Sequence, residues 1–262
     1  MTLQDQLQLH ADQLWQAERE KTPIPPLTAE DTSLRPEDAY AIQMMNVSRR
    51  LGAGERVVGH KVGLTSKPMQ NMLGVHEPDF GHLFASMQYR SGDVIDYPLL
   101  QPRVEPEIAF VLKEDLAGTD ITAHDVIRAT DYVLPAIEVV DSRVADWKIT
   151  LVDTIADNAS CGCFAIGDQA TPVGLANIGT VGGVMRVNGE VVQTGAGAAV
   201  LGHPAQSVAW LVNKLNSLGT VVRKGEIVLA GAVSAMVSVR TGDRVSVSFG
   251  RLGRVEIAFP KG

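Results

Sequence analysis

Three glutamates of this chain lie on two apolar segments that have the pattern of buried β-strands. Glu105 and Glu107 stand near the start of the run Val104–Leu112, and Glu138 lies within the run Val133–Val140. Successive side chains of a strand point to opposite faces, so Glu105 and Glu107 share one face. An isolated buried carboxylate is very costly and persists only when it is paired, protonated or bound to a metal. The fold therefore has to supply either an oxygen-rich cation site or a solvent-exposed face for these acids.

The residues alone leave these two alternatives equally open. Glu-x-Glu is common on solvated strands. Pro106 and Pro135 indicate edge strands or bulges, because proline cannot donate to a hydrogen-bond ladder. The cation site is supported because carboxylate oxygens are the ligands that hard divalent cations prefer, and three carboxylates on core-type strands suit such an ion. The two interpretations predict opposite burial for the same side chains.

Length, charge and composition limit the kind of protein. The chain has 262 residues, enough for one large core, and 45% of them are hydrophobic. A net charge of −7 without any Lys/Arg run argues against a nucleic-acid surface. No stretch approaches the roughly 20 apolar residues that span a bilayer, and the polar N-terminus fits neither a signal nor a transit peptide. Cys161 and Cys163 are too close in sequence to join distant elements, which suits reduced thiols in the cytoplasm.

Helix signals define a small N-terminal α/β portion over residues 1–90. Apolar spacing predicts an amphipathic helix from the N-terminus to about Glu20. A second helix is expected over residues 36–52, because proline suits the first turn of a helix and glycine ends one. A strand over residues 56–64 and a short helix that ends at Gly74 complete this portion.

Residues 91–262 have the pattern of a β-rich core, and we expect both portions to form one integrated domain. One helix, from Pro204 to about Gly219, interrupts the strands. The turns at residues 241–243 and 250–253 are expected to join the last three strands in a meander. Strands and helices do not alternate as βαβ units, so the prediction is an α+β fold, a mixed β-roll or sandwich with a few helices. The predicted strands cover residues 104–112, 132–140, 163–166, 183–187, 226–230, 236–240, 244–249 and 254–259.

Other polar residues that could carry chemistry each have an ordinary structural explanation. Lys61 lies in a glycine-flanked strand, where a lysine is most often a surface residue. His76 and Asp79 stand in a segment whose Pro-Asp and Phe-Gly pairs also make an ordinary turn. The polar segment Asp153–Gly162 is typical of a helix cap or turn, and Asp141–Arg143 has the same ambiguity.

Cysteine and glycine motifs give weak signals. Cys161-Gly-Cys163 lacks a second Cys/His pair, so a buried structural role is favoured over a metal site. The glycine-rich segment Thr194–Gly202 has Val200 where a dinucleotide-binding loop needs its third glycine, and it has no Walker lysine. His203 precedes Pro204 and is favoured as a residue that leads into a helix rather than as a ligand. Nucleotide binding is therefore not expected.

Taken together, several segments resemble the hydratase/decarboxylase branch of the fumarylacetoacetate hydrolase superfamily, most closely its 2-hydroxypenta-2,4-dienoate (2-keto-4-pentenoate) hydratases. The resemblance runs almost from end to end, and its combined motifs are specific although each alone is weak. It implies the β-roll core of the fumarylacetoacetate hydrolase C-terminal type, with an N-terminal α/β portion, in homo-oligomers. The segments are residues 59–66, 69–81, 101–110, 134–143, 153–162 and 194–204.

The same resemblance implies a metal centre with Mg²⁺ or Mn²⁺. The Glu-x-Glu of the family's metal site falls on Glu105 and Glu107, and its third carboxylate ligand falls on Glu138. An all-oxygen donor set agrees with these hard cations.

Three further residues match the family's active-site positions. Its lysine matches Lys61, the acid of its Pro-Asp-(Phe/Tyr)-Gly motif matches Asp79, and the serine of its Asp-Asn-Ala-Ser motif matches Ser160. We hypothesise that Lys61 neutralises the substrate carboxylate or enolate and that Asp79 handles a proton or the attacking water. Ser160 would orient a substrate oxygen.

The implied activity is that of a hydro-lyase in aromatic meta-cleavage catabolism. Protonation of 2-hydroxypenta-2,4-dienoate at C5 gives the 2-oxo-3-enoate, and water addition at C4 with protonation at C3 gives 4-hydroxy-2-oxopentanoate. The cation acts as a Lewis acid toward the 2-oxygen. The alternative activity is decarboxylation of 2-oxo-3-hexenedioate (4-oxalocrotonate), and a more remote one is a non-catalytic partner subunit. The resemblance also implies that the protein can form a complex with the decarboxylase of the same pathway.

Overall fold

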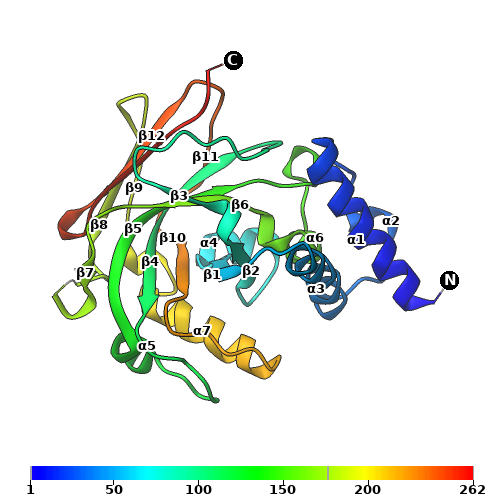
Figure 1. Cartoon of the computed structure of the whole chain (residues 1–262), viewed down its shortest axis with the longest axis horizontal. Coiled ribbons are helices and arrows are strands. Elements are labelled where there is room, and N and C mark those ends of the chain that lie inside the picture. Colours follow the sequence, from blue (N-terminus) through cyan, green and yellow to red (C-terminus); the bar gives the residue numbers. More distant parts are fainter. Residues whose placement is uncertain (1, 176, 262) are drawn as a thin grey trace.

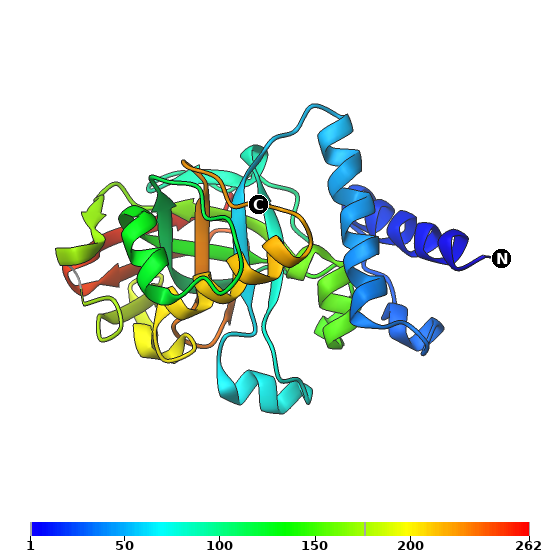
Figure 2. The same cartoon turned by 90° about the horizontal axis from the view of Figure 1, so that it is seen from below.

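Two β-sheets form the body of the protein, and helices near the N-terminus lie at one end of it (Figures 1 and 2). The computed structural model describes residues 2–175 and 177–261. Two short strands extend the larger sheet, β7 (Thr171–Pro172) beside β5 and β11 (Val237–Ser238) beside β4. The main strands of the larger sheet are, in order, β2 (Asp79–Phe84), β1 (Val57–Gly63), β10 (Ile227–Ala232), β4 (Arg103–Leu112), β5 (Thr130–Val140), β6 (Cys161–Ile166) and β3 (Gln88–Arg90). The smaller sheet has the order β13 (Gly253–Ala258), β12 (Arg244–Phe249), β8 (Gly182–Val187) and β9 (Glu190–Ala196).

Three helices close to the N-terminus form, together with Ile155 and Ala156, a separate small hydrophobic cluster beside the sheets. They are α1 (Leu3–Glu20), α2 (Leu27–Glu30) and α3 (Pro36–Gly52). Thr2 and Asp5 form a reciprocal capping box that satisfies N–H groups of the first turn of α1. Within the described ranges, no helix is both long and apolar enough to cross a membrane.

The main core lies between the two sheets and beneath two further helices, α5 (Ala123–Ala129) and α7 (Pro204–Ser217). Strands β12 and β13 of the smaller sheet pack across β5, and Val247 and Phe249 of β12 are fully buried. Helix α7 packs on β1 and β10 through an apolar face that includes Val208 and Leu211. Packing on both sides leaves β4 and β5 in the interior of the molecule, where most of their side chains are shielded from water.

The structure confirms the predicted fold class and most of the predicted elements. The predicted helices correspond to α1, α3, α7 and the short α4 (Lys67–Leu73), which Gly74 ends in a left-handed conformation. The predicted strands overlap β1, β4, β5, β6, β8, β10, β11, β12 and β13. Both signals succeed because they depend on local residue order, namely apolar spacing and terminating glycine or proline.

The predicted meander of the last three strands is wrong. β12 and β13 do form a hairpin, but β11 pairs with β4 in the larger sheet, and β8 is the other neighbour of β12. Seven of the described α-helices and strands were not predicted, which are α2, β2, β3, α5, the helix α6 (Leu151–Ala156), β7 and β9. Each of these is short or polar, so contacts with the rest of the fold outweigh its weak local pattern.

Pro106 and Pro135 do not mark edge strands, because β4 and β5 are both interior strands of the larger sheet. They lie where the ladder is interrupted. The register between β4 and β10 shifts between Leu229 and Ala232, and the Pro106 carbonyl accepts from the N–H of Val233, which follows that shift. The Pro135 carbonyl accepts from Gly167, just beyond the end of β6. Pro106 therefore lies at a bulge, which was one of the two predicted possibilities. Each proline lacks an N–H group where the adjacent strand is irregular or has ended, so no regular ladder bond is lost.

Candidate metal centre

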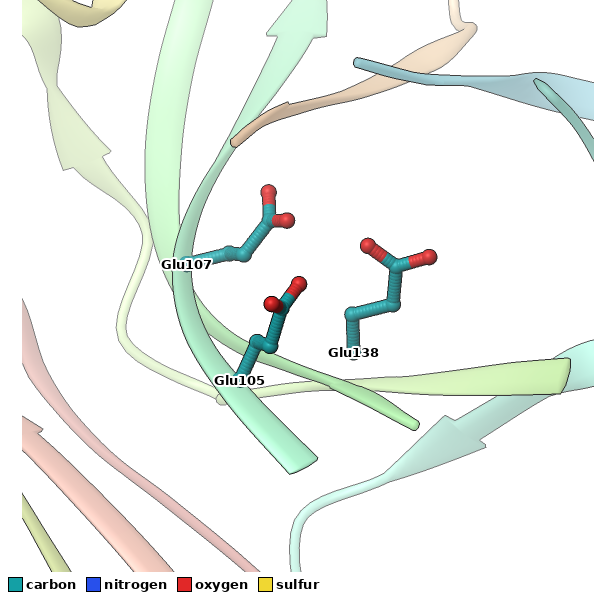
Figure 3. Close-up of side chains that lie close together, drawn as sticks. All are labelled: Glu105, Glu107 and Glu138. Atoms are coloured by element: carbon teal, nitrogen blue, oxygen red, sulfur yellow. The ribbon is translucent and has the colours of Figure 1, made fainter. Parts of the chain in front are cut away.

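Neighbouring strands β4 and β5 bring Glu105, Glu107 and Glu138 together. Glu105 lies opposite Glu138 in this antiparallel pair, and Glu107 follows two residues along β4 on the same face. One carboxylate oxygen from each glutamate lies within 4.8 Å of the other two. Figure 3 shows the three side chains directed into a common space. Glu107 and Glu138 are 0% exposed and Glu105 is half-buried, so the solvent-facing alternative does not describe these acids.

The oxygens of this cluster have fewer hydrogen-bond partners than buried carboxylates need. Both oxygens of Glu138 and the Oε1 atom of Glu107 have no hydrogen-bond partner among the described residues. Burial raises the pKa of Glu105 to about 7, and the charge of Glu138 contributes. Burial and the same neighbour raise the pKa of Glu107 well above its usual range. These oxygens fit a hard divalent cation, because such an ion would supply the missing partner and neutralise the mutual repulsion.

The bulge in β10 supplies the one hydrogen bond that the Glu107 carboxylate receives from the described residues. The N–H of Gly231 donates to Glu107 Oε2 over 2.7 Å. Gly231 has a φ of +113°, and a Cβ atom there would lie 2.3 Å from the hydroxyl oxygen of Thr65. Only glycine meets both conditions, so this residue fixes one oxygen of Glu107 and leaves the other directed at the cluster. Sequence reasoning did not identify Gly231.

Lys61 lies on β1 and reaches the cluster from the side. Its Nζ atom is 3.2 Å from Glu138 Oε1 and donates to the carbonyl oxygen of Ala159 over 2.9 Å. The side chain is buried, which by itself lowers the pKa of a lysine. The charges of Glu138 and Asp79 outweigh this effect and raise the pKa of Lys61, so it is an ammonium ion at neutral pH. The surface alternative for Lys61 is therefore wrong.

Asp79 begins β2 directly opposite Gly63, at the end of β1. It is 1% exposed, and its Oδ1 atom has no hydrogen-bond partner among the described residues. Burial raises the pKa of Asp79, although the Lys61 ammonium and the Thr154 hydroxyl oppose the increase. A Cβ atom on residue 63 would lie 2.2 Å from Asp79 Oδ1, so Gly63 leaves room for this carboxyl. His76, in the preceding loop, is exposed.

Ser160 lies beside Lys61 through the short turn η3 (Asn158–Ser160). Its neighbour Ala159 accepts the Lys61 hydrogen bond, and the Ser160 hydroxyl is 3.2 Å from the hydroxyl of Thr154 on α6. The structure thus brings all six predicted site residues into one region. It adds Thr154, which the sequence analysis left within a polar turn segment.

The remaining candidates have structural roles. Cys161 and Cys163 are buried free thiols on β6, and burial raises the pKa of both. The Nδ1 atom of His203 accepts from the N–H of Ala205 and so caps the start of α7, as predicted.

Comparison with known proteins agrees with this arrangement. A model of the family described as fumarylacetoacetate (FAA) hydrolase C-terminal matches residues 51–259. The chain is 43% identical over 256 residues to a 2-hydroxyhexa-2,4-dienoate hydratase of Comamonas testosteroni, and the match covers 97% of each chain. It is 51% identical over 210 residues to a 2-hydroxypent-2,4-dienoate hydratase of Pseudomonas putida, covering 79% of this chain and 95% of the relative.

A solved structure shares both the sheets and the helices. The 4-oxalocrotonate decarboxylase from Pseudomonas putida G7, in complex with magnesium and adipate, superposes on this chain with a TM-score of 0.94 and 37% sequence identity. The superposition covers 99% of this chain and 98% of the other. The N-terminal helices therefore belong to an arrangement that extends across the whole of both chains.

Proposed function

The chain belongs to the fumarylacetoacetate hydrolase family, and we propose that it is a metal-dependent hydratase of 2-hydroxypenta-2,4-dienoate in aromatic meta-cleavage catabolism. The reaction passes through the 2-oxo-3-enoate tautomer and gives 4-hydroxy-2-oxopentanoate. The observation that carries this proposal is the cluster of three carboxylates with unpartnered buried oxygens next to the Lys61 ammonium. The names of the relatives at 43% and 51% identity support the hydration of short dienoates.

Glu105, Glu107 and Glu138 would hold a divalent cation, for which we propose Mg²⁺ or Mn²⁺. An all-oxygen site is the kind that both ions prefer, and the related decarboxylase was solved with magnesium. When bound, the cation supplies Lewis-acid stabilisation of negative charge on a substrate oxygen. The half-buried position of Glu105 leaves the cluster accessible from that side.

Lys61 binds and orients the substrate. An ammonium group has three N–H donors, and in this structure two of them are directed at Glu138 and at the carbonyl of Ala159. The third donor forms no hydrogen bond with the residues that the structure describes, so it could bind the carboxylate or the 2-oxygen of the substrate. The positive charge of Lys61 would stabilise the enolate that forms when the enol loses its proton.

Asp79 moves the proton. As a carboxylate, Asp79 would accept the proton of the 2-hydroxyl and deliver it to C5. It would then accept a proton from the water that adds at C4 and deliver it to C3, so the protons balance and the carboxylate is regenerated. Burial raises the pKa of Asp79, which favours the protonated form between these steps. The buried Oδ1 atom, which has no hydrogen-bond partner among the described residues, is the atom that we assign to this exchange. The paired hydroxyls of Ser160 and Thr154 orient a substrate oxygen beside it.

Decarboxylation of 2-oxo-3-hexenedioate is the second candidate, because the chain resembles a solved 4-oxalocrotonate decarboxylase over its whole length. One purified preparation assayed with the dienoate and with the enedioate separates the two functions. We expect hydration of the dienoate with Mg²⁺ or Mn²⁺, and loss of turnover with a chelator that returns on addition of metal. Release of CO₂ from the enedioate without water addition to the dienoate would reverse the assignment.

The location, the assembly and the domain organisation of the enzyme are also proposals. Reduced, buried Cys161 and Cys163 support a cytoplasmic location. We propose a homo-oligomer that can associate with the decarboxylase of the same pathway. Residues 1–90 contribute Lys61 and Asp79, and residues 91–262 contribute the three glutamates, so the two portions would act as one domain.

A further inference from the structure

The turn that carries Ser160 is left-handed, although none of its residues is glycine. Asn158, Ala159 and Ser160 have φ values of 53°, 52° and 51°. In this conformation the Cβ atom of an L-residue crowds the following carbonyl oxygen, so even a single such residue is unfavourable. Three in succession persist only where the surrounding contacts over-determine the conformation.

Asn158 fixes the turn to the sheet. Its Oδ1 atom accepts from the N–H of His82 over 2.8 Å, and its Nδ2 atom donates to the carbonyl oxygen of His82 over 3.0 Å. This pair of bonds occupies part of the free side of β2, which is an edge strand. The approach requires Gly81, because a Cβ atom there would lie 2.4 Å from the backbone oxygen of Asn158.

Arg143 fixes both ends of the same turn from the other side. Its guanidinium donates to the carbonyl oxygen of Asp157 over 2.6 Å and to that of Cys161 over 2.9 Å, which are the residues before and after the turn. Its Nε atom also pairs with the Asp157 carboxylate. Arg143 is 5% exposed and Asp157 is 4% exposed, so water competes little for these bonds.

The conformation of the turn decides where one carbonyl points. The Ala159 carbonyl oxygen accepts from Lys61 Nζ, and its direction follows from the ψ of 38° at Ala159. A right-handed backbone would turn this oxygen away and leave Glu138 as the remaining contact of the Lys61 ammonium among residues 2–175 and 177–261. The strained conformation is therefore coupled to the orientation of the Lys61 donors.

We propose that Asn158 and Arg143 are positioning residues for hydration: they hold the Asn158–Ser160 turn left-handed, so that the Ala159 carbonyl directs the Lys61 ammonium at the substrate. The inference rests on the proposed function. Neither residue acts chemically, and both act through Lys61.

The test compares Asn158→Ala with Asn158→Gly. Both variants lose the bonds to His82, but glycine adopts positive φ without steric cost and alanine does not. A misplaced catalytic group can lower turnover about 100-fold, so we expect kcat to fall by about 100-fold for Asn158→Ala and about 10-fold for Asn158→Gly. We expect the Kd for Mn²⁺, measured by calorimetry, to stay within twofold of wild type, because the glutamates lie on β4 and β5. A purely structural role would lower metal affinity together with kcat.

Asn188 provides the control. It has the same φ of 53° on an exposed turn of the smaller sheet, and we expect Asn188→Ala and Asn188→Gly to leave kcat unchanged. The proposal is overturned if Asn158→Ala keeps kcat within twofold of wild type, if glycine is no better than alanine, or if Mn²⁺ affinity falls in proportion to kcat. A wild-type protein that hydrates no dienoate refutes the proposed function instead, so the two failures are distinguishable.

Discussion

Two groups of buried carboxylates in this molecule differ in what surrounds them. In the glutamate cluster, both oxygens of Glu138 and one oxygen of Glu107 have no hydrogen-bond partner among the described residues. Near Arg143 the opposite holds. The Asp157 carboxylate accepts from the backbone and side chain of Arg143, and the Asp141 carboxylate accepts from two backbone N–H groups.

The difference separates a group that supports the fold from a group that we propose binds a cation. Asp157 and Asp141 have exchanged water for protein donors and so resemble other satisfied buried acids. Glu107 and Glu138 have lost water and gained in return one hydrogen bond from Gly231 and the ion pair with Lys61, which is too little for three neighbouring carboxylates unless a cation binds. Replacing an acid should therefore have opposite effects on stability in the two groups.

The largest expected effect is on the glutamate cluster. Glu107→Gln should lower kcat/KM by about 10² to 10³, because the variant loses a proposed ligand of the cation that would stabilise substrate charge. Without metal, the same variant should unfold at a higher temperature than wild type, since it removes the cost of burying a carboxyl beside Glu138, the cost that raises the pKa of Glu107. Metal-dependent kinetics measure the loss in kcat/KM, and thermal melting without metal measures the rise in unfolding temperature. Glu114→Gln, at an exposed position, is the control. Full metal-dependent turnover by Glu107→Gln would remove this residue from the site.

The second effect has the reverse sign for stability. Asp157→Asn should lower the free energy of unfolding by about 3–5 kcal/mol, because it leaves Arg143 as a buried charge without its carboxylate partner. Addition of Mn²⁺ should not reduce this difference between variant and wild type. Denaturant unfolding with and without metal measures it, and Asp168→Asn on the exposed surface is the matched control. An Asp157→Asn variant as stable as wild type would abolish the contrast between the two groups.

The third effect concerns the buried histidine His82 and the dependence of stability on pH. Burial lowers the pKa of His82 from its ordinary value of 6.5 to about 4. The unfolded chain therefore binds a proton that the folded protein does not, and stability falls as the pH decreases from 6.5 toward 4. Between pH 8 and pH 5 this contribution is about 2 kcal/mol.

His82→Gln should remove this acid-dependent part of the loss in stability. Urea unfolding at pH 8 and pH 5 gives the difference for wild type, for this variant and for His124→Gln, whose side chain is exposed. Equal pH dependence in His82→Gln and wild type would show that other groups carry the acid sensitivity.

Much of the fold was predictable because its signals are local. The helix Pro36–Gly52 follows from proline at its start and glycine at its end, and the strands β4 and β5 follow from long apolar runs. β9 and β11 show the limit. The side chains of β9 are all exposed or half-exposed, so its sequence has no alternating pattern that predicts a strand. β11 pairs with β4, which lies more than a hundred residues earlier in the chain.

By itself, the sequence determined that Glu105 and Glu107 share a face, because alternation along a strand is a property of the backbone. The family resemblance pointed to Glu138, Lys61, Asp79 and Ser160. Only the tertiary structure decided that these groups lie together with unpartnered oxygens. Strand pairing across β4 and β5 sets the Glu105–Glu138 contact.

The left-handed turn at Asn158–Ser160 was not predictable for the same reason. Local preferences oppose positive φ at Ala159 and Ser160, and the conformation exists because Arg143 and the edge of β2 hold it from outside the segment. Short-range residue order fixes faces, caps and turns. Contacts between residues distant in sequence fix which side chains meet, how deeply they are buried and which of their atoms are left for a ligand.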